Sequence, residues 1–211
     1  MIVAPDAARP PSDLSLRCRC GHVRGVARGL SPSAVFRFIC YCKDCQAFAR
    51  FLARPDVLNS AGGTDIVQMP PARVTLAAGA DALRCLSLAG GSRVLRWYSA
   101  CCRTPIANTA ASPGFPLVAI IHCFIDRASD GRAHDAVLGP ALCRIYDGSA
   151  LGPLPPASPP PSSFGVSLRR ASMVLRWWMR GLARPTPFFD ERTNAPCSLP
   201  RVLTPGERAA L

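Results

Sequence analysis

The sequence contains almost no lysine. Lys43 is the only lysine among 25 Lys and Arg residues, so arginine carries nearly all of the positive charge, and the formal net charge is +12. Arginine binds carboxylates and phosphates through a rigid, two-pronged guanidinium group. The charge therefore favours an anionic partner, and on charge alone nucleic acid, an acidic membrane surface and a small polyanion are all open.

Long hydrophobic runs are also missing. The chain has no run of about 18 apolar residues, so no transmembrane helix is expected. The first residues, MIVAPDAARPPSDL, lack the basic start and apolar run of a signal peptide. The 11 cysteines are odd in number and lie in tight groups rather than in a scattered disulfide framework. We therefore expect reduced thiols and metal thiolates in a cytoplasmic protein.

Two further function classes lack their sequence signals. The basic stretches carry no interleaved aromatics, and there is no helix-turn-helix or finger spacing, so nucleic acid is not expected as a partner. The paired cysteines are Cys-x-Cys or adjacent Cys-Cys. Neither matches the Cys-x-x-Cys spacing of thioredoxin-like redox proteins.

The pattern along the chain predicts a mainly β (α+β) fold. Short apolar segments separated by Gly, Pro, Asn or Asp are typical of strands, expected at 14–18, 22–28, 34–39, 65–69, 73–77, 84–88, 93–98 and 117–125. The stretch 45–54 is expected to form a short helix. The organisation predicted is a disordered leader at 1–13, a β domain at 14–147, a proline-rich linker at 148–166, and a basic amphipathic helix with an extended tail at 167–211.

The linker and the helix have distinct compositions. Residues 152–163, GPLPPASPPPSS, are half proline and are predicted to form a semi-rigid linker or a draped loop. The helix expected at 167–184 is predicted to present one apolar face, formed by Leu168, Ala171, Val174, Leu175, Trp178 and Leu182. That face would pack on the β domain or a second subunit, or lie on an anionic membrane surface. The aromatics of the tail are expected to anchor it.

Three cysteines fall within six residues, in CYCKDC at 40–45. Residues i and i+2 of an extended chain point to the same face, which places Cys40 beside Cys42. A turn through the next two residues can bring Cys45 to them. Three converging thiolates repel one another unless a cation lies between them, and zinc is the usual cation. Three ligands leave a fourth position open for water or substrate, unless a fourth protein ligand makes the site purely structural.

A second group combines Cys18 and Cys20 with Cys101 and Cys102. Adjacent strand residues point to opposite faces, so both Cys101 and Cys102 can bind one ion only if the chain turns there. Cys102 is the favoured ligand of the two. The solitary thiols are expected to be small buried hydrophobes, namely Cys85, Cys123, Cys143 and Cys197. One or two zinc ions are thus predicted.

These motifs resemble a known family. CRCG at 18–21, CYCKDCQ at 40–46 and WYSACCRTPI at 97–106 are similar, in order and spacing, to the glutathione-dependent formaldehyde-activating enzymes and centromere protein V-like proteins. The resemblance covers about residues 14–126. It departs from the family pattern in the third motif, where Ser99 stands for a cysteine and Arg103 for a glycine. Three alternatives are open for this site. Cys101 replaces the missing cysteine through a reshaped turn, or three sulfurs and one other group bind the zinc, or the zinc site is lost.

The resemblance implies a β-tent fold with two zinc sites. Cys18 and Cys20 would join the third motif in a structural site, and Cys40, Cys42 and Cys45 would form the catalytic site. The implied activity is that of a carbon–sulfur lyase that forms an adduct between a small thiol such as glutathione and an aldehyde. Expected proton donors are Tyr41, Lys43 or His122.

Other polar residues near the motifs have less specific expectations. The nearby arginines are expected to be solvated surface charges, although an arginine-rich rim would suit the carboxylates of glutathione; they are Arg50, Arg54, Arg96 and Arg103. His122 is expected on a strand with Val118, Ile120 and Phe124, as a packed core histidine rather than a ligand. The alternative to an enzyme is a non-catalytic zinc-binding structural or interaction module.

Overall fold

The computed structural model describes residues 11–126 and 134–211. Its strands are β1 Ser12–Arg17, β2 Arg24–Leu30, β3 Phe36–Cys40, β4 Thr64–Met69, β5 Val74–Ala78, β6 Leu83–Ser87, β7 Val94–Ser99, β8 Pro105–Ala110, β9 Val118–Ile121, β10 Cys143–Ile145 and β11 Pro200–Val202. Its α-helices are α1 Lys43–Phe51, α2 His134–Leu138, α3 Phe164–Met179 and α4 Pro205–Ala209. Its short 3-10 helices are η1 Pro55–Val57, η2 Pro71–Arg73, η3 Ala80–Ala82, η4 His122–Phe124 and η5 Asp147–Ser149.

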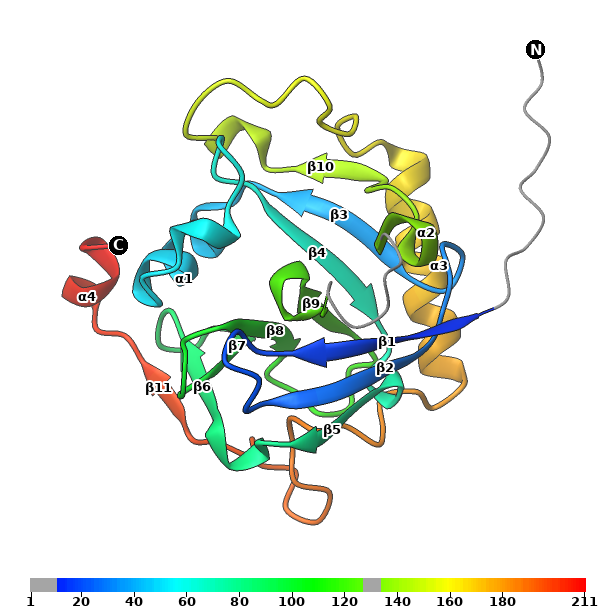
Figure 1. The fold of residues 1–211 in the computed structure, drawn as a ribbon, viewed down its shortest axis with the longest axis vertical. Coiled ribbons are helices and arrows are strands. Elements are labelled where there is room, and N and C mark those ends of the chain that lie inside the picture. The colour runs from blue at the N-terminus through cyan, green and yellow to red at the C-terminus, as the bar shows by residue number, and fades with distance from the viewer. Residues whose placement is uncertain (1–10, 127–133) are drawn as a thin grey trace.

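The described residues form a mainly β fold with two sheets. The smaller sheet has the order β1-β2-β5, and the larger has the order β10-β3-β4-β9-β8-β7-β6-β11. All neighbouring strands are antiparallel except the two short edge strands, β10 and β11, which run parallel to β3 and β6. Figure 1 shows β1 and β2 in front of the larger sheet, with α3 along its side.

The larger sheet is covered on both faces. Along β4 and β9 neighbouring residues alternate between two apolar clusters: Val67 and Ile120 face the smaller sheet, whereas Ile66 and Ile121 lie in the cluster that contains α3. A central strand with apolar residues on both sides needs two covering layers. The result is a three-layer order of small sheet, large sheet and helix.

Helix α3 packs on the β domain, which was one of the alternatives expected from the sequence. Met173 and Trp177 are buried against Phe36 and Phe38 of β3. The predicted apolar face was wrong, because three members of it are more than half exposed: Leu168 (58%), Leu175 (53%) and Trp178 (64%). The helix is apolar around a wide arc, and the sheet, rather than the helical period, selects which part is buried.

The segments that flank α3 are also attached to the domain. The proline-rich stretch follows β10 as a draped loop, because Arg144 N–H donates to Pro160 O (2.8 Å) and Ser162 N–H donates to Arg144 O (3.0 Å). It thereby covers the edge of the larger sheet. The expectation that aromatics anchor the tail is confirmed by Phe188 and Phe189, which are buried against Trp97 at ring distances of 5.2 and 6.0 Å.

Each of the eight expected strands overlaps an observed one, and the helix expected at 45–54 is α1. Strands β8, β10 and β11 were missed; the last two are three-residue edge strands that depend on a distant partner. The strand expected at 117–125 ends at Ile121, so His122 begins η4 instead of continuing the alternation. Residues 1–10 of the expected leader lie outside the described residues, whereas Ser12 and Asp13 belong to β1.

No helix in the described part of the chain is long and apolar enough to span a membrane.

The packing of α3 gives a test from two adjacent tryptophans. Trp177→Ala is expected to lower the free energy of unfolding by about 3–5 kcal/mol, because it leaves a cavity under the helix. Trp178→Ala is expected to lower it by less than about 1 kcal/mol, because that side chain is mostly exposed. Chemical denaturation of both variants measures the difference. Equal losses would contradict this orientation of the helix.

Candidate metal centres

The junction between β3 and α1 brings three cysteines together. Cys40 ends β3, Cys42 is the N-cap of α1, and Cys45 lies in its first turn. Their sulfur atoms all lie within 4.8 Å of one another. The turn expected after Cys42 is thus the first turn of the helix, where Cys45 N–H donates to Cys42 Sγ (3.4 Å). The positive end of a helix favours a thiolate at this position.

The protons of the three thiols are shared within the cluster. Hydrogen bonds from Cys40 and Cys45 lower the pKa of Cys42 to about 2, and the hydrogen bond to Cys42 raises the pKa of Cys40. The hydrogen bond with Cys40 lowers the pKa of Cys45. The hydrogen bond with Cys42, together with burial, outweighs this effect and raises the pKa of Cys45 to about 11. The cluster thus holds one thiolate readily, and further deprotonation needs a bound cation.

A buried arginine lies next to this cluster. Arg96 is 5% exposed, and its Nη1 atom is 4.0 Å from Cys45 Sγ. The guanidinium also pairs with Asp44 (3.6 Å) and lies over the Phe48 ring, 5.6 Å from its centroid. Its positive charge therefore stabilises negative charge on the sulfurs. The expectation that Arg96 is a solvated surface charge was wrong.

A small cavity adjoins Cys45 and Arg96. Its volume is about 10 Å³, close to the space that one water molecule needs. Thr64, on β4, also lines it. The Thr64 hydroxyl is buried and has no hydrogen-bond partner among the described residues. Such a group costs about 1–3 kcal/mol unless a ligand or solvent satisfies it.

The second cluster contains four sulfurs. Cys18 and Cys20 lie around the turn after β1, and Cys101 and Cys102 lie in the turn between β7 and β8. The sulfur of Cys101 is 3.8 Å from that of Cys18, 3.3 Å from that of Cys20 and 3.9 Å from that of Cys102. Four sulfurs around a tetrahedral zinc, each at about 2.3 Å, are roughly 3.8 Å apart. This cluster therefore fits a closed, four-thiolate site.

The turn after β7 explains how adjacent cysteines reach one site. Arg103 has a positive φ of 53°, and its N–H donates to Ser99 O (2.9 Å), so the chain reverses between Cys102 and Thr104. A side chain in this left-handed region costs about 1–2 kcal/mol, which glycine would avoid. Both cysteines join the cluster, so the preference for Cys102 over Cys101 is not supported by this geometry.

Two hydroxyl groups lie within hydrogen-bond distance of the Cys102 sulfur. Thr104 Oγ1 accepts from Arg19 N–H (3.0 Å) and lies 3.1 Å from Cys102 Sγ, so its own proton is free to point to the sulfur. Ser99 Oγ lies 3.3 Å from the same sulfur. Burial raises the pKa of Cys102, but these hydrogen bonds outweigh it and lower the pKa to about 5.

All seven cysteines singled out in the sequence therefore fall into two clusters, three in one and four in the other. The solitary cysteines stay outside both; Cys85 and Cys143 are buried, Cys123 is half-buried and Cys197 is exposed. Neither cluster includes a histidine or carboxylate among the described residues.

Two expectations for nearby residues change, those for His122 and Arg54, whereas Tyr41 stays a candidate proton donor. The hydroxyl of Tyr41, a candidate donor, accepts a hydrogen bond from Asn59 (3.1 Å), and the residue is fully buried. His122 is half-buried and lines a separate cavity of about 320 Å³ with Cys18. Arg54 is 8% exposed and paired with Asp56 at 2.7 Å, so the expected solvation is wrong for it too.

Sequence reasoning missed the roles of Thr64 and Arg96. Arg96 lies in VLRWYS, where most residues are buried on both faces of the strand. An arginine inside such a run is a signal for a buried charge with partners. Thr64 gave no comparable signal, because its place beside the cluster follows from the pairing of Cys40 with Thr64 across β3 and β4.

The two clusters predict separate metal sites. Titration of the reduced protein with cobalt(II), monitored by thiolate-to-cobalt absorption, should show binding at two sites. Cys20→Ser should remove one site and Cys42→Ser the other. Cys197→Ser, at an exposed cysteine outside both clusters, is the matched control and should keep both. Identical titrations of the three variants would contradict two independent centres.

Comparison with known proteins identifies a family. Residues 12–196 match the model of DUF6151, a family of unknown function. No curated protein matches the chain significantly. The family match begins in β1 and ends beyond α3, so it includes both cysteine clusters, the proline-rich segment and the helix. On this match, which covers most of its length, the chain belongs to the DUF6151 family.

Proposed function

We propose that both clusters bind zinc and that Cys40, Cys42 and Cys45 form the working centre of a thiol-adduct enzyme of the carbon–sulfur lyase type. One observation carries this proposal: three sulfurs converge next to a cavity lined by a buried arginine and an unsatisfied hydroxyl. The substrates proposed are a small thiol such as glutathione and an aldehyde. The resemblance to the glutathione-dependent formaldehyde-activating enzymes supports this choice, and with it a β-tent fold.

The sulfur sets favour zinc and suggest different tasks. Thiolates select soft metals, and a four-thiolate set suits a structural zinc that has no free position. The set of three leaves a position for another ligand. Bound there, zinc would keep an incoming thiol deprotonated at neutral pH, where a free thiol is mostly protonated. This chemistry requires reduced cysteines, and we therefore place the protein in the cytoplasm.

The residues around the cavity suit addition of a thiol to a carbonyl. The thiolate sulfur bonds to the carbonyl carbon, the π electrons move to oxygen, and the proton lost by the thiol returns to that oxygen. Arg96 would stabilise the negative charge on the oxygen, and the Thr64 hydroxyl would donate a hydrogen bond to it. A cavity of about 10 Å³ would exclude any carbonyl compound larger than formaldehyde. The thiol would approach from Cys42, which is the most exposed of the three cysteines.

A structural role for both clusters is the second candidate. Cys40 and Cys45 are 4% and 7% exposed and belong to the apolar cluster beneath α3. A centre that only stabilises the fold would have this degree of burial, and the chain would then be a non-catalytic zinc module that acts through binding. Expected contacts of α3 with a membrane surface or a second copy belong to this candidate.

Glutathione binding separates the two candidates. In the cobalt-loaded protein, glutathione should change the visible spectrum, because it adds a sulfur to the three-cysteine centre. Cys42→Ser should abolish that change, while Cys197→Ser keeps it. If Cys42→Ser unfolds the chain as severely as Cys20→Ser, and glutathione leaves the spectrum of the native protein unchanged, the structural role is correct.

Thr64→Val tests the proposed function by opposite effects on stability and activity. Valine has the same shape without the unsatisfied hydroxyl, so the free energy of unfolding should rise by about 1 kcal/mol. The rate of adduct formation from glutathione and formaldehyde should fall by about 10- to 100-fold, because a donor to the developing alkoxide is lost.

The matched control for this variant is Thr75→Val at an exposed position of β5, which should change neither quantity. Adduct formation that is unchanged in Thr64→Val would remove the hydroxyl from the mechanism. Adduct formation no faster than in protein-free buffer would overturn the proposed activity itself.

A further inference from the structure

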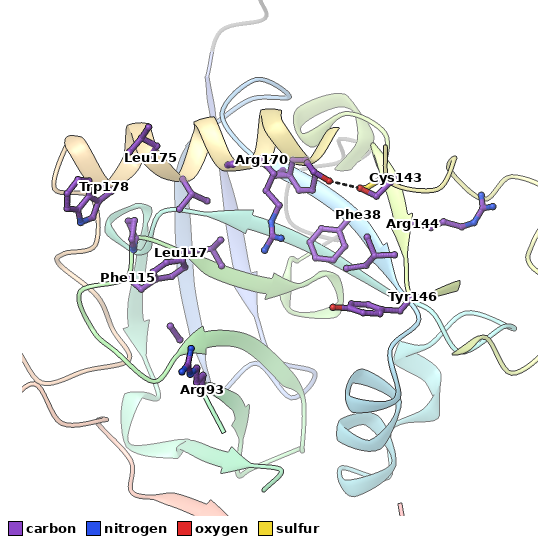
Figure 2. A pocket seen from close by; sticks show the side chains of 18 of the residues that line it. Phe38, Arg93, Phe115, Leu117, Cys143, Arg144, Tyr146, Arg170, Leu175 and Trp178 are labelled. Carbon is purple, nitrogen blue, oxygen red and sulfur yellow. Dashed lines mark hydrogen bonds between the residues drawn. The ribbon is translucent and has the colours of Figure 1, made fainter. Parts of the chain in front are cut away.

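An open groove runs between α3 and the larger sheet. It has a volume of about 1490 Å³, which exceeds the roughly 300–1,000 Å³ of sites for drug-sized ligands. Phe36 and Phe38 of β3 line it together with Leu117, and the segments 110–117 and 143–147 form its other sides. Figure 2 shows α3 across this groove, with Phe38, Leu117 and Phe115 pointing into it from the sheet side.

The rim of the groove concentrates exposed apolar side chains. Four large ones line it: Phe115 is 46% exposed, Tyr146 64%, Leu175 53% and Trp178 64%. They come from three separate parts of the chain and converge on one concavity. Single exposed apolar residues are common, but a group of this size around a hollow marks a binding surface.

The groove contains a fixed positive charge. Arg170 extends from α3 toward Phe38 and Leu117 (Figure 2), and its Nε atom donates to the buried Gln68 side chain at 2.7 Å. This hydrogen bond orients the guanidinium and leaves its terminal nitrogens available to bind an anion in the bidentate manner.

Two of the arginines that line the groove are not paired with an acid among the described residues. Among the residues that the structure describes, neither Arg93 nor Arg170 lies within ion-pair distance of a carboxylate. Asp147 is the acidic residue of the lining, and Arg144 pairs with it at 2.9 Å. An occupant with an apolar body and one anionic end would therefore complement both the walls and the charge.

We propose that this groove binds a long-chain aliphatic carboxylate, with the hydrocarbon chain against Phe36, Phe38 and Trp178 and the carboxylate on Arg170. The apolar walls suit a hydrocarbon chain, and the oriented guanidinium of Arg170 suits one carboxylate. This proposal is independent of the chemistry proposed for the cysteines, because none of the three clustered cysteines lines the groove.

The experiment is competitive binding to the whole 211-residue chain. A dansyl-labelled undecanoic acid reports occupancy by fluorescence, and hexadecanoate displaces it below its critical micelle concentration. Hexadecanol is the uncharged competitor of equal length. Arg170→Met, which keeps the apolar stem, should lower the affinity for hexadecanoate about tenfold. It should change the affinity for hexadecanol less than twofold. Arg176→Met, on the same helix outside the groove, is the matched control and should change neither.

A second variant tests the cavity itself. Ala171→Trp places a large ring in the groove and should abolish displacement by both competitors while thermal stability is retained. If it does not fold, Ala111→Trp fills the groove from the opposite wall and takes its place. Absence of saturable probe binding would overturn the proposal. Equal affinities of the Arg170→Met and Arg176→Met variants for hexadecanoate would overturn it as well. Probe binding that appears only with lipid vesicles, or only in a dimer seen by sedimentation, would overturn it in favour of a membrane or a second copy.

Discussion

The arrangement of the three-cysteine cluster depends on the sharp junction at which β3 becomes α1. The junction is fixed on several sides: β4 and β10 hold β3, and the Tyr41 ring lies in a fully buried site. Gly63 allows this close packing, because a Cβ there would lie 2.6 Å from the Tyr41 ring and 2.7 Å from Ile39. The backbone that carries the three sulfurs is therefore held in place. A bound cation is the remaining way to deprotonate them together.

The two cysteine clusters have different surroundings, and the differences follow their proposed tasks. The four-cysteine cluster is on short turns, with hydroxyl groups from Ser99 and Thr104 directed to Cys102. The three-cysteine cluster lies between strand, helix and core, with a buried arginine beside it and a cavity open to one small molecule. A metal that only holds turns needs every position filled, whereas a reactive one needs a vacant position and a stabilising charge nearby.

Much of the fold and the membership of both clusters could be predicted from the sequence. Strand signals are local, and the spacing of Cys40, Cys42 and Cys45 already limits how far apart their sulfurs can be. The features that could not be predicted depend on pairing between residues that are far apart in the sequence. Thr64 meets Cys40 only through the register of β3 and β4, and β11 exists only because the tail returns to β6. The apolar face predicted for α3 was wrong because apolar residues cover a wide arc of this helix, so packing on the sheet decides that Trp177 and not Trp178 is buried.

Strand β3 runs from the groove to the three-cysteine cluster. Phe36, Phe38 and Cys40 point to the same face in turn, so the floor of the groove ends about 7 Å from the first cysteine of the cluster. Helix α3 forms the other wall of that groove, and without it Phe36 and Phe38 would be exposed to solvent. The helix lies within the segment matched by the family model, together with both clusters. It is therefore part of the same packed unit as the cysteines, because Met173 and Trp177 share one apolar cluster with Cys40 and Cys45.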